Sequence, residues 1–218
     1  MPEKRYKIIY EDDRLIVVDK PSGMLVIPTP KQEKNTLTDL LNKDLDSRGV
    51  EANAHPCHRI DRETSGLVIY AKGKSTQKLM MDLFKTRKIS KKYIAIVRGA
   101  VKKSFDTIRS SIYNRNRKRS EEAITRYKVV SRTKDFSVLE VEPVTGRTNQ
   151  IRIHLAGIGH PILGERVYAF RRDFKIRFKR LALHATRIEF THPVTGAKMV
   201  FESPLPEDIG RLINQEVQ

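Results

Sequence analysis

The sequence predicts an α+β fold in which a mixed, largely antiparallel central sheet is flanked by helices. Runs of β-branched residues bounded by turn residues recur along the chain, whereas few stretches show the apolar spacing of a helix. Regular helical crossovers do not separate these runs, which disfavours a doubly wound parallel sheet. Because the 218 residues contain no internal repeat and no long linker, we expect one domain spanning residues 1–218.

The first half of the chain predicts three strands and two helices. Thr36 followed three residues later by Asp39 is the signature of a helix N-terminus, and leucines then recur on one helical face before Gly49. Ser75 can cap a second helix, whose inner face carries Leu79, Met80, Leu83 and Phe84. The strands are predicted at residues 6–10, 15–18 and 67–70.

The second half is predicted to be rich in strands. Phe170, Phe174 and Phe178 recur at helical spacing, so we interpret them as the core-facing stripe of a helix rather than as groups that stack on bases. The strands of this half are predicted at residues 93–97, 124–130, 136–141, 181–190 and 198–201.

The charge of the chain is strongly one-sided. It contains 43 Lys and Arg against 26 Asp and Glu, a formal net charge of +17, and much of the excess gathers in residues 72–92, 115–119 and 171–180. Such clusters favour a polyanionic partner, most simply a nucleic acid. Composition alone does not choose between DNA and RNA.

A single cysteine, Cys57, excludes an internal disulfide and a multi-cysteine zinc site. No stretch reaches the roughly 18 consecutive apolar residues of a membrane span. We therefore expect a cytoplasmic protein with no membrane partner.

The densest group of chemically capable side chains lies at residues 55–66, directly before the strand at 67–70. A metal site built from His55, Cys57 and His58 is disfavoured, because such closely spaced ligands rarely suit one tetrahedral ion. A Cys57 nucleophile is equally disfavoured, since a lone thiol is more often a small buried residue. Asp61, between Arg59 and Arg62, is the better candidate for a nucleophile or base, although these residues taken alone favour a loop salt bridge over a chemical role.

The segment His58-Arg59-Ile60-Asp61-Arg62-Glu63-Thr64-Ser65-Gly66 resembles the H-R-L-D-x-x-T-S-G motif of the RluA family of RNA pseudouridine synthases. Two positions depart from the family pattern, because Ile60 replaces the usual Leu and Asn149 stands where many relatives carry His. Further blocks agree in the family's order, at residues 20–23, 91–97, 145–155, 159–165 and 181–185.

The resemblance implies the pseudouridine synthase catalytic fold and an enzyme that isomerises specific uridines in structured RNA, ribosomal or transfer RNA, to pseudouridine. It implies no cofactor and no metal, and the chain shows neither of the common glycine-rich nucleotide-binding loops. We expect the protein to act on RNA, not DNA, as a monomer. We do not expect the separate N-terminal RNA-binding domain of some relatives, so the basic clusters would have to hold RNA.

The resemblance also assigns roles. Asp61 would support the anomeric carbon during glycosyl transfer, Arg147 would keep Asp61 ionised, and Tyr93 would lie against the uracil. The target base must leave the RNA stack, and Arg59 would fill the gap. The remaining expected substrate contacts are His58, Thr64 and Ile151, and the expected contacts to the RNA backbone are Arg115, Arg117, Lys118 and Arg119.

Two other functions compete. A non-catalytic RNA-binding or ribosome-assembly protein could share the fold, but the intact Asp61, Tyr93 and Arg147 disfavour it. A hydrolytic glycosidase normally needs a second carboxylate, and Glu63 is the only acid near Asp61 in the sequence. Analysis of the product separates an isomerised base, unchanged RNA and free uracil.

Overall fold

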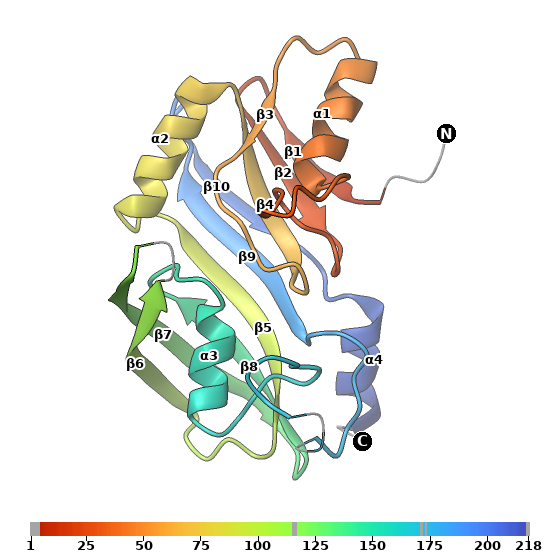
Figure 1. Ribbon diagram of the computed structural model, residues 1–218, viewed down its shortest axis with the longest axis vertical. Coiled ribbons are helices and arrows are strands. Elements are labelled where there is room, and N and C mark those ends of the chain that lie inside the picture. Colours follow the sequence, from red (N-terminus) through yellow and green to blue (C-terminus); the bar gives the residue numbers. More distant parts are fainter. Residues whose placement is uncertain (1–4, 115–116, 171, 173, 217–218) are drawn as a thin grey trace. The chain divides into compact units, whose positions relative to one another are not determined.

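The computed structural model describes residues 5–114, 117–170, 172 and 174–216. Figure 1 shows a strand-rich chain with four labelled helices, α1 (Leu37–Ser47), α2 (Lys74–Lys85), α3 (Gln150–Gly157) and α4 (Glu207–Glu216). The strands are β1 (Lys7–Glu11), β2 (Leu15–Lys20), β3 (Ala54–Pro56), β4 (Ser65–Lys72), β5 (Ser90–Arg98), β6 (Phe105–Asn114), β7 (Arg119–Arg132), β8 (Phe136–Pro143), β9 (Leu183–Thr191) and β10 (Lys198–Glu202).

The chain divides into two compact units. The first unit comprises Met1–Ile89 and Arg187–Ser203, and the second comprises Ser90–Thr186 and Pro204–Gln218. Strand β9 therefore contributes its beginning to the second unit and its end to the first.

The first unit is organised around β4, whose first seven residues are all buried. Strand β2 pairs antiparallel with β4 from Leu15 opposite Ala71 to Lys20 opposite Gly66. Strand β1 pairs antiparallel with β2, and β3 pairs antiparallel with β4. Alternate residues of β2 and β4 form one apolar cluster with the fully buried Met80 of α2. Burial of this face fixes the register, since a slip of one residue would turn every side chain to the opposite face.

Helix α1 begins as the sequence predicts. The Thr36 hydroxyl accepts from the Asp39 amide, and the Asp39 carboxylate accepts from the Thr36 amide, so the N-terminus carries a complete capping box. Leu37, Leu41 and Leu45 form the buried face of the helix.

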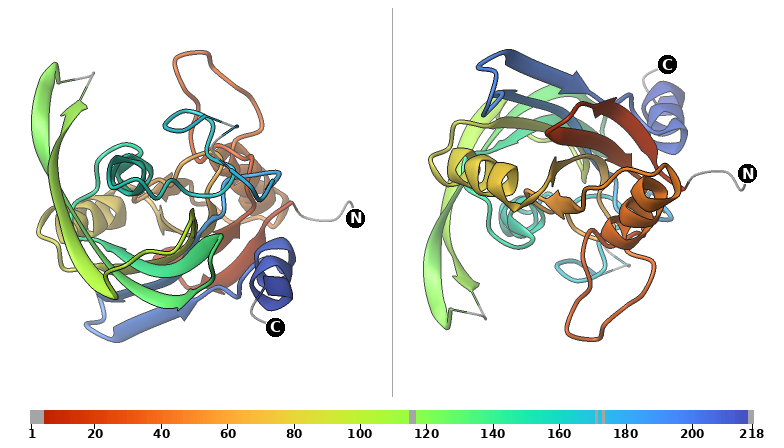
Figure 2. Two further views of the ribbon diagram at one scale, coloured as in Figure 1. Left: turned by 90° about the horizontal axis from the view of Figure 1, so that it is seen from below. Right: turned by 90° about the horizontal axis from the view of Figure 1, so that it is seen from above.

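In the second unit the strands follow the order β9, β5, β8, β7 and β6. Strands β5 and β8, β7 and β8, and β6 and β7 pair antiparallel, and β6 and β7 form a long hairpin. Figure 2 shows this hairpin curving around α3. Inward-facing residues of β7 are buried on that side, including Glu121, Ala123, Thr125 and Tyr127.

The predicted fold class is confirmed, because the sheet is mixed and mostly antiparallel and is accompanied by helices. The sequence interpretation missed β3, β6, α3 and α4, and it placed the start of β7 at residue 124 instead of Arg119.

The predicted helix with a core-facing phenylalanine stripe is wrong. Phe170 is 68% exposed, and the described residues between 170 and 180 form no α-helix. Arg171 and Asp173 lie outside the described residues. Phe170 and Phe178 instead lie beneath arginine guanidinium groups, with Arg172 at 4.9 Å from the first ring and Arg180 at 5.9 Å from the second.

Within the described ranges, no helix combines the length and the apolar character that crossing a membrane requires.

Gly164 allows a close approach of two backbone segments in the second unit. Its φ is +79°, and a Cβ atom on it would lie 1.8 Å from the carbonyl oxygen of Arg180. The side chain of the next residue, Glu165, is fully buried and accepts two hydrogen bonds from Arg152, at 2.8 and 2.7 Å. Gly164 thus lets the chain bring Glu165 to its arginine partner.

Replacing Gly164 by Ala should destabilise the protein by about 2–4 kcal/mol, because both the positive φ and the contact with Arg180 resist a side chain. Urea unfolding measures the effect. The control is Gly210→Ala in α4, where a Cβ meets no atom within 4 Å. Equal free energies of unfolding for the two variants would contradict the assigned role.

Candidate active site

The Asp61 loop, defined as residues 57–64, connects β3 to β4 in the first unit. The Thr64 amide donates to the Asp61 carbonyl oxygen at 3.1 Å, which closes a tight turn. Asp61 is partly buried, its neighbour Ile60 is buried, and Arg59 is exposed. The loop therefore presents a carboxylate and a guanidinium from a turn anchored beside the fully buried part of β4.

The buried side chain of Lys20 holds this loop in place through hydrogen bonds. The Lys20 side chain has no solvent exposure, and its ammonium donates to the carbonyl oxygens of Pro21, Met24 and Arg62 at 2.9, 2.8 and 3.2 Å. Three N–H groups thus meet three acceptors, which offsets the cost of burying the charge. The contact with Arg62 ties the end of β2 to the residue that follows Asp61.

The turn that follows Lys20 adds further bonds to the Asp61 loop. The Gly23 amide donates to the Arg62 carbonyl oxygen at 2.8 Å, and the Arg62 Nε donates back to the Gly23 carbonyl oxygen at 3.1 Å. The Ser22 hydroxyl donates to the Glu63 carbonyl oxygen at 2.6 Å. Gly23 has a φ of +86°, a backbone conformation that favours glycine.

His58 and Cys57 both have structural environments within the first unit. The Ile69 amide donates to Nε2 of His58 at 3.1 Å, and the imidazole ring packs on Phe84 of α2 with ring centroids 4.7 Å apart. Burial raises the pKa of the Cys57 thiol to about 12, so the thiol stays protonated at neutral pH. Cys57 is therefore a buried core residue whose protonated thiol is poorly suited to nucleophilic attack.

Thr64 lies at the end of the loop and is 1% exposed. Its hydroxyl is buried and makes no hydrogen bond within the part of the chain that the structure describes. A buried hydroxyl without a partner is costly for a fold, and this one lies at the end of the loop that carries Asp61.

Tyr93 and Ile151 are positioned by the second unit. Tyr93 lies on β5 opposite Val141 of β8, and it is 8% exposed. Ile151 lies in the first turn of α3 and is 7% exposed. Both side chains are held by regular elements rather than by loops.

Gln150 organises the segment that carries Arg147. Its side-chain oxygen accepts from the Thr145 hydroxyl at 2.6 Å and from the Arg147 amide at 3.0 Å. Its side-chain nitrogen donates to the Ile124 carbonyl oxygen and to the Thr125 hydroxyl, both at 2.9 Å. The amide is buried and all these bonds are made inside the second unit, so the backbone at Arg147 is fixed to β7.

The guanidinium of Arg147 binds two neighbours on β7. Its Nε donates to the Glu122 carbonyl oxygen at 3.1 Å, and its Nη1 lies 3.1 Å from Oε2 of Glu121. Sequence reasoning did not single out Glu121 or Gln150. Gln150 stands in the quoted family block, and Glu121 follows a basic cluster at a spacing that places it on the inner face of a strand.

Asn149 is one of the two positions that depart from the family pattern. It has a φ of +55°, which Asn tolerates better than most residues, and it immediately precedes α3. Its Nδ2 donates to the Tyr168 hydroxyl at 2.9 Å, and its side-chain oxygen accepts from Arg152 at 3.3 Å. Asn149 thus has defined partners in the second unit.

Two arginines of the basic cluster at residues 115–119 already form ion pairs within the protein. Arg117 and Arg119 both pair with Glu121, at 2.8 and 3.3 Å, while Lys118 is exposed in the turn. Arg115 lies outside the described residues.

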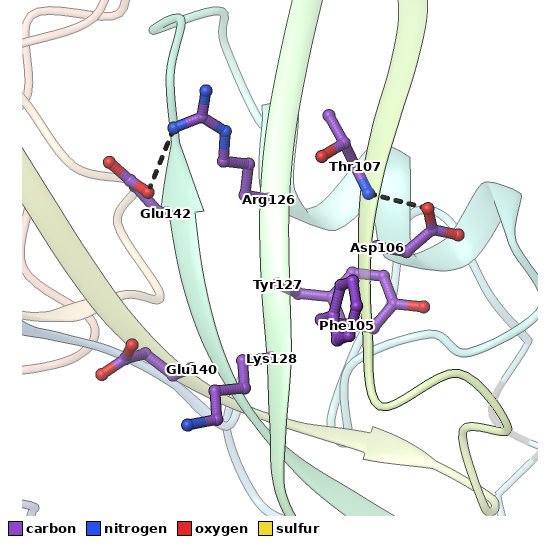
Figure 3. Close-up of a pocket in the computed structure, with 8 residues that line it drawn as sticks. All are labelled: Phe105, Asp106, Thr107, Arg126, Tyr127, Lys128, Glu140 and Glu142. Atoms are coloured by element: carbon purple, nitrogen blue, oxygen red, sulfur yellow. Dashed lines mark hydrogen bonds and ion pairs between the residues drawn. The ribbon is translucent and has the colours of Figure 1, made fainter.

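A shallow hollow on the second unit lies over β6, β7 and β8 (Figure 3). In this hollow Arg126 pairs with Glu142 at 3.8 Å, and the Asp106 carboxylate accepts from the Thr107 amide at 2.8 Å. None of the site residues predicted from the sequence lines it.

Comparison with known proteins identifies the family. Residues 14–157, which include Asp61, Tyr93 and Arg147, match the family model described as RNA pseudouridylate synthase. The chain belongs to the RNA pseudouridine synthase family. It is an isomerase of RNA uridine, as the resemblance of its motifs predicted.

Individual pseudouridine synthases are similar to this protein in sequence or structure over nearly the whole chain. The Uncharacterized RNA pseudouridine synthase YlyB of Bacillus subtilis is 36% identical, covering 94% of this chain and 71% of that protein. The Ribosomal large subunit pseudouridine synthase D of Pseudomonas aeruginosa is 34% identical, covering 93% and 69%. Among solved structures, Human RNA Pseudouridylate Synthase Domain Containing 4 superposes with a TM-score of 0.82 at 25% identity, covering 96% of this chain and 92% of that chain.

Replacing Lys20 by Met should destabilise the protein by about 2–4 kcal/mol, because the carbonyl groups of Pro21, Met24 and Arg62 each lose a hydrogen bond from a buried ammonium. Urea unfolding measures the loss. Lys7→Met, at an exposed position of β1, is the matched control. An unfolding midpoint no lower than that of the control would show that the carbonyl groups find other partners.

Glu121 should make stability depend on pH. The Asn114 amide, with help from Arg117 and Arg147 and against the effect of burial, lowers the pKa of Glu121 from 4.5 to about 2. Because the folded state binds this proton more weakly than the unfolded state, the stabilisation is fully present above pH 4.5 and is lost as the pH falls toward 2.

The difference in the free energy of unfolding between the wild type and Glu121→Gln should therefore be constant near neutral pH and shrink across that acidic window. Urea unfolding at a series of pH values measures it, with other carboxylates cancelling in the difference. A difference that does not change with pH would contradict a depressed pKa.

Proposed function

We propose that this protein isomerises uridine to pseudouridine in ribosomal RNA of the large subunit. The observation that carries the proposal is the family match over residues 14–157, in which the H-R-I-D-x-x-T-S-G segment stands on a loop held by Lys20. Relatives named Ribosomal large subunit pseudouridine synthase D are 34% identical across more than nine-tenths of the chain, which supports ribosomal RNA as the substrate class.

The reaction breaks the bond between N1 of uracil and C1′ of ribose and forms a bond between C5 and C1′. The C5 proton leaves, and N1 ends protonated, so no atom of the base is lost. Asp61 supplies the carboxylate that meets positive charge developing at C1′, whether by attack at C1′ or by abstraction of the C2′ proton. Arg147 is the cation that the family resemblance assigns to this carboxylate, and a neighbouring cation favours the ionised form of a carboxyl group.

Base flipping precedes the chemistry. Arg59 is exposed beside Asp61, and its planar guanidinium can stack in the place that the uridine leaves. Tyr93 offers a ring to the uracil and assists removal of the C5 proton, while Ile151, His58 and Thr64 complete the substrate contacts. Both Tyr93 and Ile151 are buried on regular elements, which suits side chains that must keep a fixed geometry.

The positive surface supplies affinity for RNA. Helix α2 carries exposed lysines at Lys78 and Lys85, and Arg87 and Lys88 follow it, so phosphate contacts can hold the RNA without reading its sequence. In the second unit, the exposed side chains of Arg117, Lys118 and Arg119 near the tip of the β6–β7 hairpin can contact further phosphate groups. Arg115, expected in the same role, lies outside the described residues.

Asp61→Asn should abolish pseudouridine formation, lowering the rate by more than about 1,000-fold, because it removes the charge with little change in volume. The assay incubates purified protein with large-subunit ribosomal RNA and with transfer RNA from cells lacking the gene, and maps pseudouridine chemically. The control is Glu63→Gln, which removes an exposed carboxylate from the same loop. Unchanged RNA affinity in Asp61→Asn confirms that folding and binding persist.

Each alternative result is distinct. Pseudouridine made by Asp61→Asn would refute the role of Asp61. Modification of transfer RNA alone would refute the proposed substrate, and release of free uracil would refute the isomerisation.

A further inference from the structure

One carboxylate on β7 connects the tip of the β6–β7 hairpin with the segment that carries Arg147. Oε1 of Glu121 accepts from Arg117 at 2.8 Å and from Arg119 at 3.3 Å. Oε2 accepts from Nδ2 of Asn114 at 3.0 Å and lies 3.1 Å from Nη1 of Arg147. Both oxygens thus bind donors near the hairpin tip, and Oε2 also binds Arg147.

The three arginines and the glutamate of this group differ strongly in exposure. The side chains of Arg117 and Arg119 are 61% and 65% exposed, that of Arg147 is 32% exposed, and that of Glu121 is 6% exposed. A buried carboxylate forms strong charge-assisted hydrogen bonds, whereas exposed arginines change partners readily. Glu121 is therefore the fixed member of this group.

Arg147 depends on this fixed member for its direction. Its backbone is held by Gln150 at one end, and its guanidinium is held by the Glu122 carbonyl oxygen and by Glu121 at the other. Without the Glu121 carboxylate, the guanidinium keeps one neutral acceptor and faces two nearby like charges, Arg117 and Arg119.

We propose that Glu121 is a positioning residue for the isomerisation reaction, which sets the direction of the Arg147 guanidinium and couples it to the arginines at the hairpin tip. This inference rests on the proposed function, because it assumes that Arg147 acts in the reaction. Phosphate groups that draw Arg117 and Arg119 away leave the carboxylate to Arg147 and Asn114, so binding of RNA at the tip strengthens the ion pair between Glu121 and Arg147.

The variant that tests this role is Glu121→Gln, which keeps the size of the side chain and removes its charge. Single-turnover formation of pseudouridine with saturating enzyme should slow by roughly tenfold or more, the loss expected for a hydrogen bond to a charged group. RNA affinity should stay equal or increase, because a negative charge beside three arginines is gone. A purely structural role would instead weaken binding and turnover together.

The matched control is Glu142→Gln, which removes a strand carboxylate from another ion pair of the second unit, with Arg126. It should change the rate by less than about twofold, since exposed ion pairs contribute little. If Glu121→Gln fails to fold, Glu121→Asp replaces it, and its retained charge on a shorter side chain should give an intermediate rate.

A double-mutant cycle separates action through Arg147 from any other effect. In an Arg147→Met background, with product collected over hours, Glu121→Gln should slow the reaction by less than about twofold. A full tenfold loss in that background, or a Glu121→Gln rate equal to that of Glu142→Gln, would overturn the inference. Absence of pseudouridine in the wild type would instead refute the proposed function itself.

Discussion

The buried ammonium of Lys20 is the interaction on which the candidate site depends. A charge removed from water is tolerated only when its hydrogen-bonding groups are satisfied, and Lys20 meets the carbonyl oxygens of Pro21, Met24 and Arg62. These three oxygens belong to a turn after β2 and to the Asp61 loop, so one ammonium keeps both backbones in place. The antiparallel pairing of β2 with β4 then sets where the loop stands.

The second unit uses the same principle with other groups. The side-chain amide of Gln150 forms hydrogen bonds with Thr145, the Arg147 backbone and β7. The carboxylate of Glu121 binds both Arg147 and the hairpin tip. Buried polar networks whose members are all satisfied specify one geometry, and loss of one member leaves the others unpaired. The direction of the Arg147 side chain is thus an outcome of several contacts rather than of the arginine alone.

Local sequence patterns predicted some elements and misled about others. The capping box at Thr36 and the apolar runs of β2, β4 and β5 were read correctly because their signals are short-range. Helix α3 was missed because Ile151, Ile153 and Leu155 alternate as in a strand, and its start depends on the left-handed Asn149. Strand β6 was missed because most of its side chains are not buried, so it lacks an apolar run.

The sequence by itself determined the fold class, the family and the identity of the candidate chemical groups, because these follow from local periodicity and from ordered motifs around Asp61, Tyr93 and Arg147. Only the tertiary structure decided how those groups are held. Lys20 donates to a carbonyl group 42 residues away, and Glu121 pairs with Arg147 from a different element. No local sequence pattern predicts either of these two contacts. Such contacts depend on strand register and on the complete satisfaction of buried polar atoms, and these conditions exist only once distant segments of the chain have packed together.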